Sequence, residues 1–145
     1  MNVKLICGPP GSGKTSYVKA HKRWGDLVID RDWILMAISG EDYYDNPEAL
    51  RPLAEAARSA IIGKMRSSVD ISTAWVIIGG ARIADRDRWR TEYNAKVIML
   101  EVSPNECVRR ITSDERRKGK YELWQPIVAR WWDRYERDER DTIVI

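Results

Sequence analysis

The chain has 145 residues, of which 43% are hydrophobic and 32% charged, and its formal net charge is +3. These values are typical of one globular domain, and no apolar run approaches the ~20 residues of a membrane-spanning helix. The mild charge does not by itself predict a nucleic-acid-binding surface, because such surfaces gather basic residues on one face. No signal-peptide pattern is present, and Cys7 and Cys107 lack metal-type spacing, so we expect a cytoplasmic protein with reduced thiols.

Five short apolar runs divide the chain into segments of helical length. Each run is nearly continuous in apolar character, which is typical of parallel strands buried on both faces of a sheet. The runs cover residues 3–7, 27–30, 75–79, 96–102 and 142–145. Their alternation with helices predicts an α/β fold, in which helices flank a five-stranded parallel sheet within a single domain of residues 1–145.

Helices are expected between these runs, and two of them have a marked start. Residues 47–68 follow Asn46, a candidate N-cap, with Pro47 at the first helical position. Ser103 and Glu106 form a capping box for the helix that follows the fourth run. The other helices are expected over 13–23, 84–94 and 123–140, and we interpret the tryptophans of the last as packing residues.

A phosphate-binding loop is predicted over residues 8–15. Their sequence, GPPGSGKT, fits G-x-x-x-x-G-K-[ST] at every position, after a strand and before a helix. In such a loop the backbone N–H groups and the helix dipole attract the phosphates, and the lysine reaches the β- and γ-phosphates. The pattern predicts ATP binding, with Mg²⁺ held by the Thr15 hydroxyl. The candidate nucleotide-binding residues are Gly8, Pro10, Gly11, Ser12, Gly13, Lys14, Thr15 and Ser16.

Two other classes of P-loop protein fit the sequence less well. None of the asparagines in the sequence begins the N-K-x-D motif with which GTPases read their base. Motor ATPases and helicases need an acidic residue at the end of a strand to hold Mg²⁺, whereas the third run ends in Gly79 and Gly80. These features count against a GTPase and against an efficient motor.

Acidic residues follow the second run instead, in VIDRDW, residues 28–33. Here the sequence resembles the P-loop kinase superfamily of nucleotide, nucleoside and polynucleotide kinases, above all its small phage-type polynucleotide 5′-kinase and zeta-toxin-like group. The resemblance spans nearly the whole chain, although only the phosphate loop is a specific motif. It implies that Asp32, in the pair Arg31-Asp32, takes the proton of the acceptor hydroxyl as a catalytic base. The alternative for Asp32 is an N-cap or first-turn acid of a helix.

The sequence departs from the family pattern at two places. The family has an acceptor-binding Arg three residues after the catalytic Asp, where this chain has Leu35. Either Arg31 or Arg82 takes that role, or the acceptor carries no phosphate there. Because the third run has no terminal acid, Mg²⁺ is expected to rest on Thr15, phosphates and water, with Asp30 or Asp32 in the outer shell.

An arginine-rich lid is expected over residues 110–124, after the fourth run. The resemblance implies that Arg110 stacks on the adenine and that Arg116 and Arg117 are catalytic, neutralising the transferring phosphoryl group. A mobile lid would also exclude water from the reaction. Ion pairing of these arginines at the surface, with Asp114 or Glu115, is the alternative.

Three functions remain open from the sequence. The first is an ATP-dependent phosphotransferase that acts on a nucleotide, nucleoside or polynucleotide 5′-hydroxyl and retains residual ATPase activity. The second is an ATP-binding or slow ATPase module that assists a phage replication or packaging partner. The third is a kinase of a small non-nucleotide acceptor such as a sugar, for which Leu35, Trp24 and Trp33 would be suited.

Overall fold

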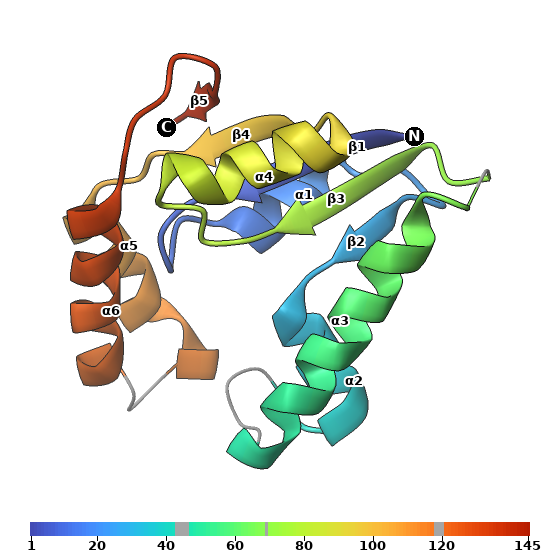
Figure 1. Ribbon diagram of the computed structural model, residues 1–145. Coiled ribbons are helices and arrows are strands. Elements are labelled where there is room, and N and C mark those ends of the chain that lie inside the picture. Colours follow the sequence, from blue (N-terminus) through green and yellow to red (C-terminus); the bar gives the residue numbers. More distant parts are fainter. Residues whose placement is uncertain (43–46, 69, 118–120) are drawn as a thin grey trace.

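Figure 1 shows the computed structural model of the chain, which describes residues 1–42, 47–68, 70–117 and 121–145. Five parallel strands form one sheet in the order β2-β3-β1-β4-β5, which confirms the predicted single-domain α/β fold. Every predicted apolar run overlaps one strand. The strands are β1 (Asn2–Cys7), β2 (Leu27–Ile29), β3 (Thr73–Ile77), β4 (Lys96–Leu100) and β5 (Thr142–Val144).

Helices and short 3₁₀ turns connect the strands. The helices are α1 (Lys14–His21), α2 (Arg31–Ser39), α3 (Arg51–Met65), α4 (Ile83–Tyr93), α5 (Pro104–Ser113) and α6 (Tyr121–Arg134), and the turns are η1 (Glu48–Leu50) and η2 (Glu115–Arg117). Helix α2 was not predicted from the sequence. It starts where the Asp30 side chain accepts a hydrogen bond from the Asp32 backbone, and it ends at Gly40 in a left-handed conformation.

Of two predicted helix starts, the structure confirms one and contradicts the other. The cap of α5 is confirmed, because the Ser103 side chain accepts the backbone N–H of Glu106 at 3.3 Å. The start of the 47–68 helix was wrong: Pro47 precedes the turn η1, and α3 begins at Arg51 with a proline in its first turn. Asn46, the predicted cap, lies outside the described residues.

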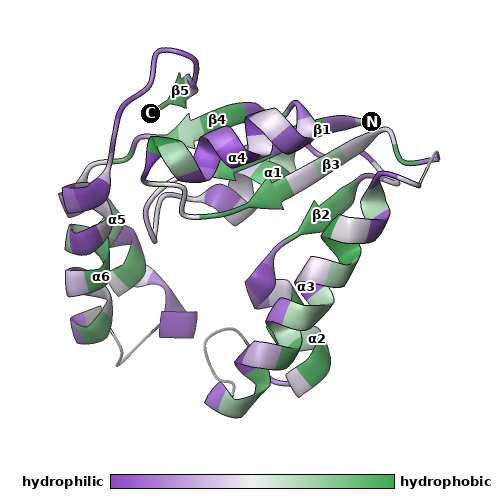
Figure 2. Ribbon diagram, viewed as in Figure 1, coloured by the Kyte–Doolittle hydropathy of each residue, from purple (hydrophilic) through white to green (hydrophobic). Residues whose placement is uncertain are grey.

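The sheet separates two apolar clusters. On one face, Trp89 of α4, Met65 of α3 and Trp131 of α6 pack against the strands, and on the other Val18 of α1 does so. Figure 2 shows the corresponding pattern, with hydrophobic central strands and hydrophilic outward turns on α4. Burial of Trp131 confirms its predicted packing role. Among the described segments, no helix has the length and apolar character to cross a membrane.

A buried ionic cluster fixes the chain after α6. Arg86 of α4 is fully buried, donates hydrogen bonds to the carbonyls of Gly80, Ala81 and Glu136, and forms an ion pair with Asp141 at 3.1 Å. The Asp141 carboxylate also pairs with Arg90 of the same helix. The predicted helix over 123–140 was therefore too long: α6 ends at Arg134, because these contacts hold residues 135–141 as a loop that leads into β5.

Arg86→Met tests the contribution of this cluster to stability. The substitution leaves the buried Asp141 carboxylate without one of its two cations, so we expect the free energy of unfolding to fall by about 3–5 kcal/mol in urea denaturation. The control is Arg88→Met on the same helix, whose side chain is 76% exposed and which should change the free energy by less than ~0.5 kcal/mol. Equal losses in both variants would contradict the prediction.

Candidate active site

A cleft of about 1510 Å³ lies at the carboxyl ends of the central strands. The loops after β1, β2 and β3 form its floor, α2 and α3 border one side, and η2 and α6 border the other (Figure 1). Open parallel sheets bind ligands at this edge. Ser12 of the phosphate loop is buried and does not line the cleft. All the other predicted site residues line it: Gly8, Pro10, Gly11, Gly13, Lys14, Thr15, Ser16, Arg31, Asp32, Arg82, Arg110, Arg116 and Arg117.

The lysine of the phosphate loop binds backbone carbonyls of the same loop. The Lys14 ammonium donates hydrogen bonds to the carbonyls of Gly8 and Pro9, at 2.8 and 2.9 Å. Gly13, with φ of 87°, ends the loop in the left-handed region and precedes the first residue of α1. Arg110 of α5 donates to the carbonyl of Ser12 at 3.1 Å, so α5 also supports the loop.

Gly80, the second of the two glycines after β3, lies where an acidic side chain could not fit. A Cβ atom at Gly80 would lie 2.5 Å from the Cys7 sulfur, and its φ of +60° strains any other residue. The carbonyl of Gly79 accepts the Gly8 backbone N–H at 3.1 Å and the Trp131 indole N–H at 2.9 Å. The position where motor ATPases carry an acid is thus used for close backbone packing beneath the phosphate loop.

Two neighbouring aspartates after β2 are placed differently. Asp30 is buried; one of its carboxylate oxygens caps α2, and the other accepts the Thr15 hydroxyl at 3.2 Å. Burial raises the pKa of the Asp30 carboxyl, and the negative charge of Asp32 adds to the effect. Asp32 lies in the first turn of α2 and lines the cleft, but its side chain is not the N-cap of the helix. The N-cap part of the alternative for Asp32 was therefore wrong, because Asp30 is the cap, whereas its other part, an acid in the first turn of a helix, is confirmed.

The contact between Thr15 and Asp30 is the arrangement most suited to Mg²⁺. Within the described parts of the chain, no group of three or more His, Cys, Asp or Glu side chains gathers to hold a metal by itself. Magnesium prefers oxygen ligands and usually keeps several waters while it binds substrate phosphates. A hydroxyl and a carboxylate oxygen 3.2 Å apart beside the phosphate loop fit this type of site.

The two consecutive arginines of η2 have different surroundings. Arg116 forms a two-pronged contact with Asp114 at 3.0 and 2.9 Å, and half of its side chain is exposed. The Arg117 side chain is only 11% exposed, and its guanidinium lies over the Trp124 ring, 4.5 Å from the centroid. The predicted ion pairing with Asp114 is present for both. Residues 118–120 of the predicted lid lie outside the described residues.

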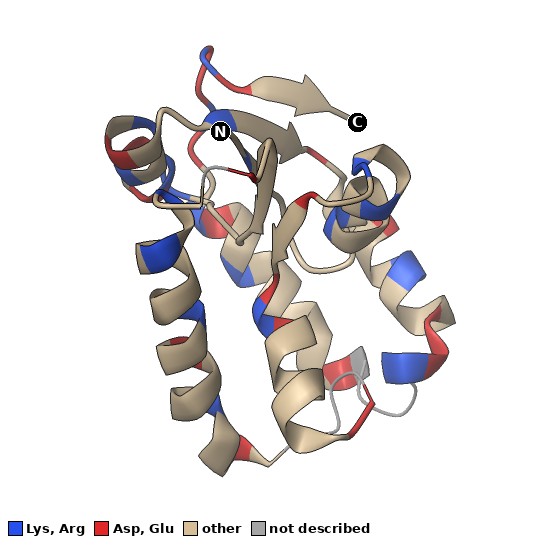
Figure 3. Ribbon diagram, turned by 90° about the vertical axis from the view of Figure 1, so that its right-hand side faces the viewer, with Lys and Arg blue, Asp and Glu red and all other residues tan. Residues whose placement is uncertain are grey.

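Sequence reasoning missed the contribution of α6 to the cleft. Its residues at helical spacing, Leu123, Ile127, Arg130 and Arg134, line the wall opposite α2 and α3. Figure 3 shows basic residues, with some acidic ones, on the helices that border the cleft. The helical spacing of these four residues could have predicted a second face of the helix. From the sequence we considered only the tryptophans of this helix and interpreted them as packing residues.

The Lys14 ammonium is in an environment that disfavours its charge. The pKa of Lys14 is lowered to about 8, mainly by removal from water and also by the nearby positive charge of Arg117. The free protein therefore loses this proton as the pH rises through about 8. A bound triphosphate would favour the charged form, so that its pKa rises on binding.

This difference predicts proton uptake when ATP binds under alkaline conditions. At about pH 9, ATP binding should take up close to one proton, and ATP affinity should fall as the pH rises above about 8. Calorimetric titrations in two buffers of different ionisation enthalpy measure the uptake. Lys14→Met should abolish it and Lys22→Met, at the C-cap of α1 and outside the cleft, should preserve it. Equal uptake by the Lys14→Met protein would contradict this assignment.

No protein-family model and no curated protein matches this sequence. Solved structures nevertheless share its fold. A gluconokinase from Sinorhizobium meliloti 1021 is 18% identical with a TM-score of 0.61, over 99% of this chain and 81% of that chain. A chain of the Pnkp1/Rnl/Hen1 RNA repair complex is 13% identical with a TM-score of 0.61, over 93% of this chain and 46% of that chain. TT1252 from Thermus thermophilus is 17% identical with a TM-score of 0.57, over 99% of this chain and 86% of that chain. The chain therefore has the fold of the P-loop kinases.

Proposed function

We propose that the protein is an ATP-dependent phosphotransferase that moves the γ-phosphate of ATP to a hydroxyl of a nucleotide, a nucleoside or the 5′ end of a polynucleotide. One observation carries the proposal: the phosphate loop and the segment of the two aspartates meet in one cleft, joined by the contact between Thr15 and Asp30. A carboxylate that is not needed for helix capping, that of Asp32, thus borders the same cleft as the phosphate loop.

A bound triphosphate would provide new partners for the groups of the phosphate loop. The backbone N–H groups of the loop and the amino-terminal end of α1 would surround the phosphates. The Lys14 ammonium would exchange the carbonyls of Gly8 and Pro9 for phosphate oxygens. Thr15, with Asp30 in the outer shell, would hold Mg²⁺, which supplies charge neutralisation at the β- and γ-phosphates.

The transfer step assigns a role to Asp32. The acceptor hydroxyl gives its proton to the Asp32 carboxylate while its oxygen forms a bond to the γ-phosphorus, and the bond between that phosphorus and the bridging oxygen breaks to release ADP. Arg117 is better placed than Arg116 to neutralise the transferring group, because its charge acts on Lys14 and its side chain is largely shielded from water.

A small non-nucleotide acceptor is the second candidate. Leu35 is 4% exposed at the position where the resemblance leads one to expect an acceptor-binding arginine. In addition, one of the proteins of the same fold is a gluconokinase, which covers 99% of this chain. Both observations favour an acceptor that does not need a cation at residue 35.

A transfer assay with ATP labelled at the γ-phosphate separates these candidates. The acceptors are nucleosides, nucleoside monophosphates, 5′-hydroxyl oligonucleotides, sugars and nucleotide sugars, each compared with water alone. We expect label in one of the nucleotide or oligonucleotide products, above a slow release of inorganic phosphate. Label that reaches only water would overturn the phosphotransferase proposal, and label that reaches only sugars would favour the second candidate.

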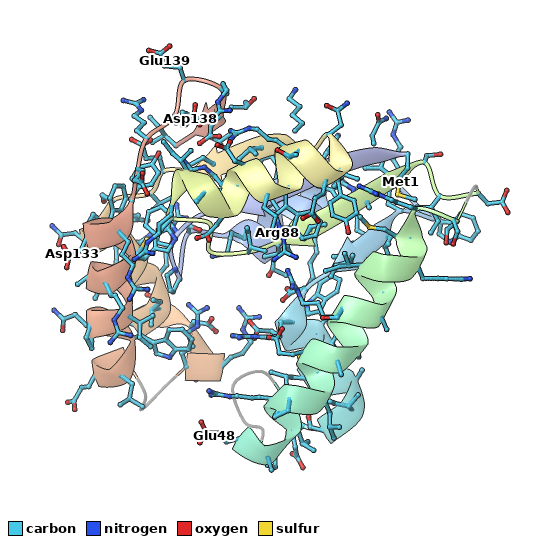
Figure 4. All side chains as sticks on the ribbon, in the orientation of Figure 1. Met1, Glu48, Arg88, Asp133, Asp138 and Glu139 are labelled. Atoms are coloured by element: carbon cyan, nitrogen blue, oxygen red, sulfur yellow. The ribbon has the colours of Figure 1, made fainter. Side chains whose placement is uncertain are left out.

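Substitutions of Lys14 and Asp32 should have different effects. Lys14→Ala and Asp32→Ala should each lower phosphotransfer at least ~100-fold, because they remove a charge-stabilising group and a general base. Only Lys14→Ala should also weaken ATP binding, measured by calorimetry. Asp133→Ala is the control, since this residue lies on the outward side of α6, away from α2 and α3 (Figure 4). Normal turnover in the Asp32→Ala protein would remove Asp32 from the mechanism.

The two arginines of η2 can be compared directly. We expect Arg117→Gln to lower the maximal transfer rate about 100-fold, as loss of a transition-state cation does, and Arg116→Gln to lower it less than ~10-fold. Single-turnover rates at saturating ATP measure the difference. A larger loss in the Arg116→Gln protein would reverse the assignment.

A further inference from the structure

We propose that the acceptor carries a phosphate group separate from its reacting hydroxyl, and that Arg82, Arg130 and Arg134 bind this group. The inference rests on the proposed phosphotransferase function and narrows its substrate class. It excludes nucleosides and unphosphorylated sugars as the preferred acceptors.

The first observation concerns the partners of the arginines that line the cleft. Several are paired: Arg31 with Glu55 at 3.5 Å, Arg51 with Glu48 at 3.6 Å, Arg110 with Glu106, and Arg116 and Arg117 with Asp114. In contrast, the guanidinium groups of Arg82, Arg130 and Arg134 form no ion pair or hydrogen bond within the described part of the chain, and all three residues are exposed. Three unpaired cations in one cleft repel one another unless an anion joins them.

The second observation is that backbone and indole contacts bring these arginines to one end of the cleft. Trp131 donates its indole N–H to Gly79, and the Glu136 backbone donates to the Ala81 carbonyl at 2.9 Å. The end of α6 is therefore held on the loop that contains Arg82. Arg130 and Arg134, which precede and follow Trp131 on the helix, face the cleft from this anchored end.

The order of the strands places Arg82 between the phosphate loop and the acceptor side. The phosphate loop follows β1, Arg82 belongs to the loop after β3, and the aspartates follow β2, with β3 between β1 and β2 in the sheet. The cations beside the phosphate loop are different ones: Lys14, which lies within the loop, and Arg110, which donates to Ser12. Arg82 is thus available for a second anion between the phosphate loop and Asp32, and Arg130 and Arg134 can reach it from the opposite wall, because the end of α6 is held on the loop of Arg82.

The charge and chemistry of the cleft favour phosphate as that anion. Among the residues that the structure describes, its lining contains ten cationic and five acidic side chains, whereas the whole chain has a net charge of only +3. Nine of the ten cations are arginines, whose planar forks match the oxygens of a phosphate with two parallel hydrogen bonds. The phosphomonoester of a mononucleotide and the phosphodiester of a strand with a free 5′-hydroxyl share this chemistry.

A binding experiment tests the site apart from catalysis. The protein is first saturated with Mg²⁺ and a non-hydrolysable ATP analogue, and is then titrated with a nucleoside, the matching nucleoside monophosphate and a 5′-hydroxyl dinucleotide. We expect a phosphate-bearing probe to bind at least ~10-fold more tightly than the nucleoside, as charge-assisted hydrogen bonds predict. The monophosphate and the dinucleotide distinguish a mononucleotide acceptor from a strand.

Variants assign the binding to these arginines. The double variant Arg130→Gln with Arg134→Gln should lose about 10- to 100-fold in affinity for the phosphate-bearing probe, as should Arg82→Gln. Arg137→Gln is the matched control, because this residue follows α6 closely, is 69% exposed and pairs with Glu101 outside the cleft. An equal loss of affinity for the ATP analogue in the double variant would overturn the inference, since it would assign Arg130 and Arg134 to the triphosphate.

The transfer assay then tests the acceptor-phosphate site and the phosphotransferase function separately. Equal binding and equal labelling of the nucleoside and its phosphorylated counterpart would overturn the acceptor-phosphate site and leave the phosphotransferase function intact. Tight, arginine-dependent binding of the phosphate-bearing probe without any transfer of label would support the site and overturn the phosphotransferase function.

Discussion

The carbonyl oxygen of Gly79 joins three parts of the active cleft. It accepts the backbone N–H of Gly8, at the start of the phosphate loop, and the indole N–H of Trp131, in the last turn of α6. One backbone group thus fixes the phosphate loop, the loop after β3 and the wall of the cleft relative to one another. The buried Arg86 supports the same region, because it binds the carbonyls of Gly80 and Ala81.

This junction explains how the cleft differs chemically from that of a motor ATPase. A side chain at position 80 would clash with Cys7, and the carboxylates that we assign to the site come from the segment after β2. There Asp30 is buried and bound to Thr15 and to the start of α2, which leaves the Asp32 side chain to face the cleft. In the proposed mechanism Asp30 is the carboxylate near the metal and Asp32 is the general base.

Much of this arrangement could be predicted from local sequence. The five apolar runs, the phosphate loop and the Ser103 cap depend on neighbouring residues, and the structure has all of them. The end of α6 could not be predicted in this way, because residues 135–141 contain good helix formers and are held as a loop by Arg86 and Arg90 of α4. Arg86 itself lies in a charged stretch that resembles a solvated helix, and only the tertiary structure reveals that it is fully buried.

Some site residues can likewise be assigned from the local sequence, whereas others depend on contacts between distant segments. The positions of Lys14 and Thr15 follow from the loop motif, whereas sequence alone could not distinguish Arg116 from Arg117. Their difference arises from burial of Arg117 against Trp124, a contact that depends on how η2 packs on α6. Arg130 and Arg134 of α6, which have no ion pair within the described residues, likewise become candidates for anion binding only when the tertiary structure places the end of α6 on the loop of Arg82.

A crystal structure of the protein with Mg²⁺, a non-hydrolysable ATP analogue and a 5′-hydroxyl dinucleotide would test the central claim most directly. The measurement is the distance between the acceptor hydroxyl oxygen and the Asp32 carboxylate. The account predicts about 2.6–3.2 Å, with the hydroxyl in line with the γ-phosphate. A hydroxyl bound elsewhere in the cleft, out of reach of Asp32 and of the γ-phosphate, would contradict it.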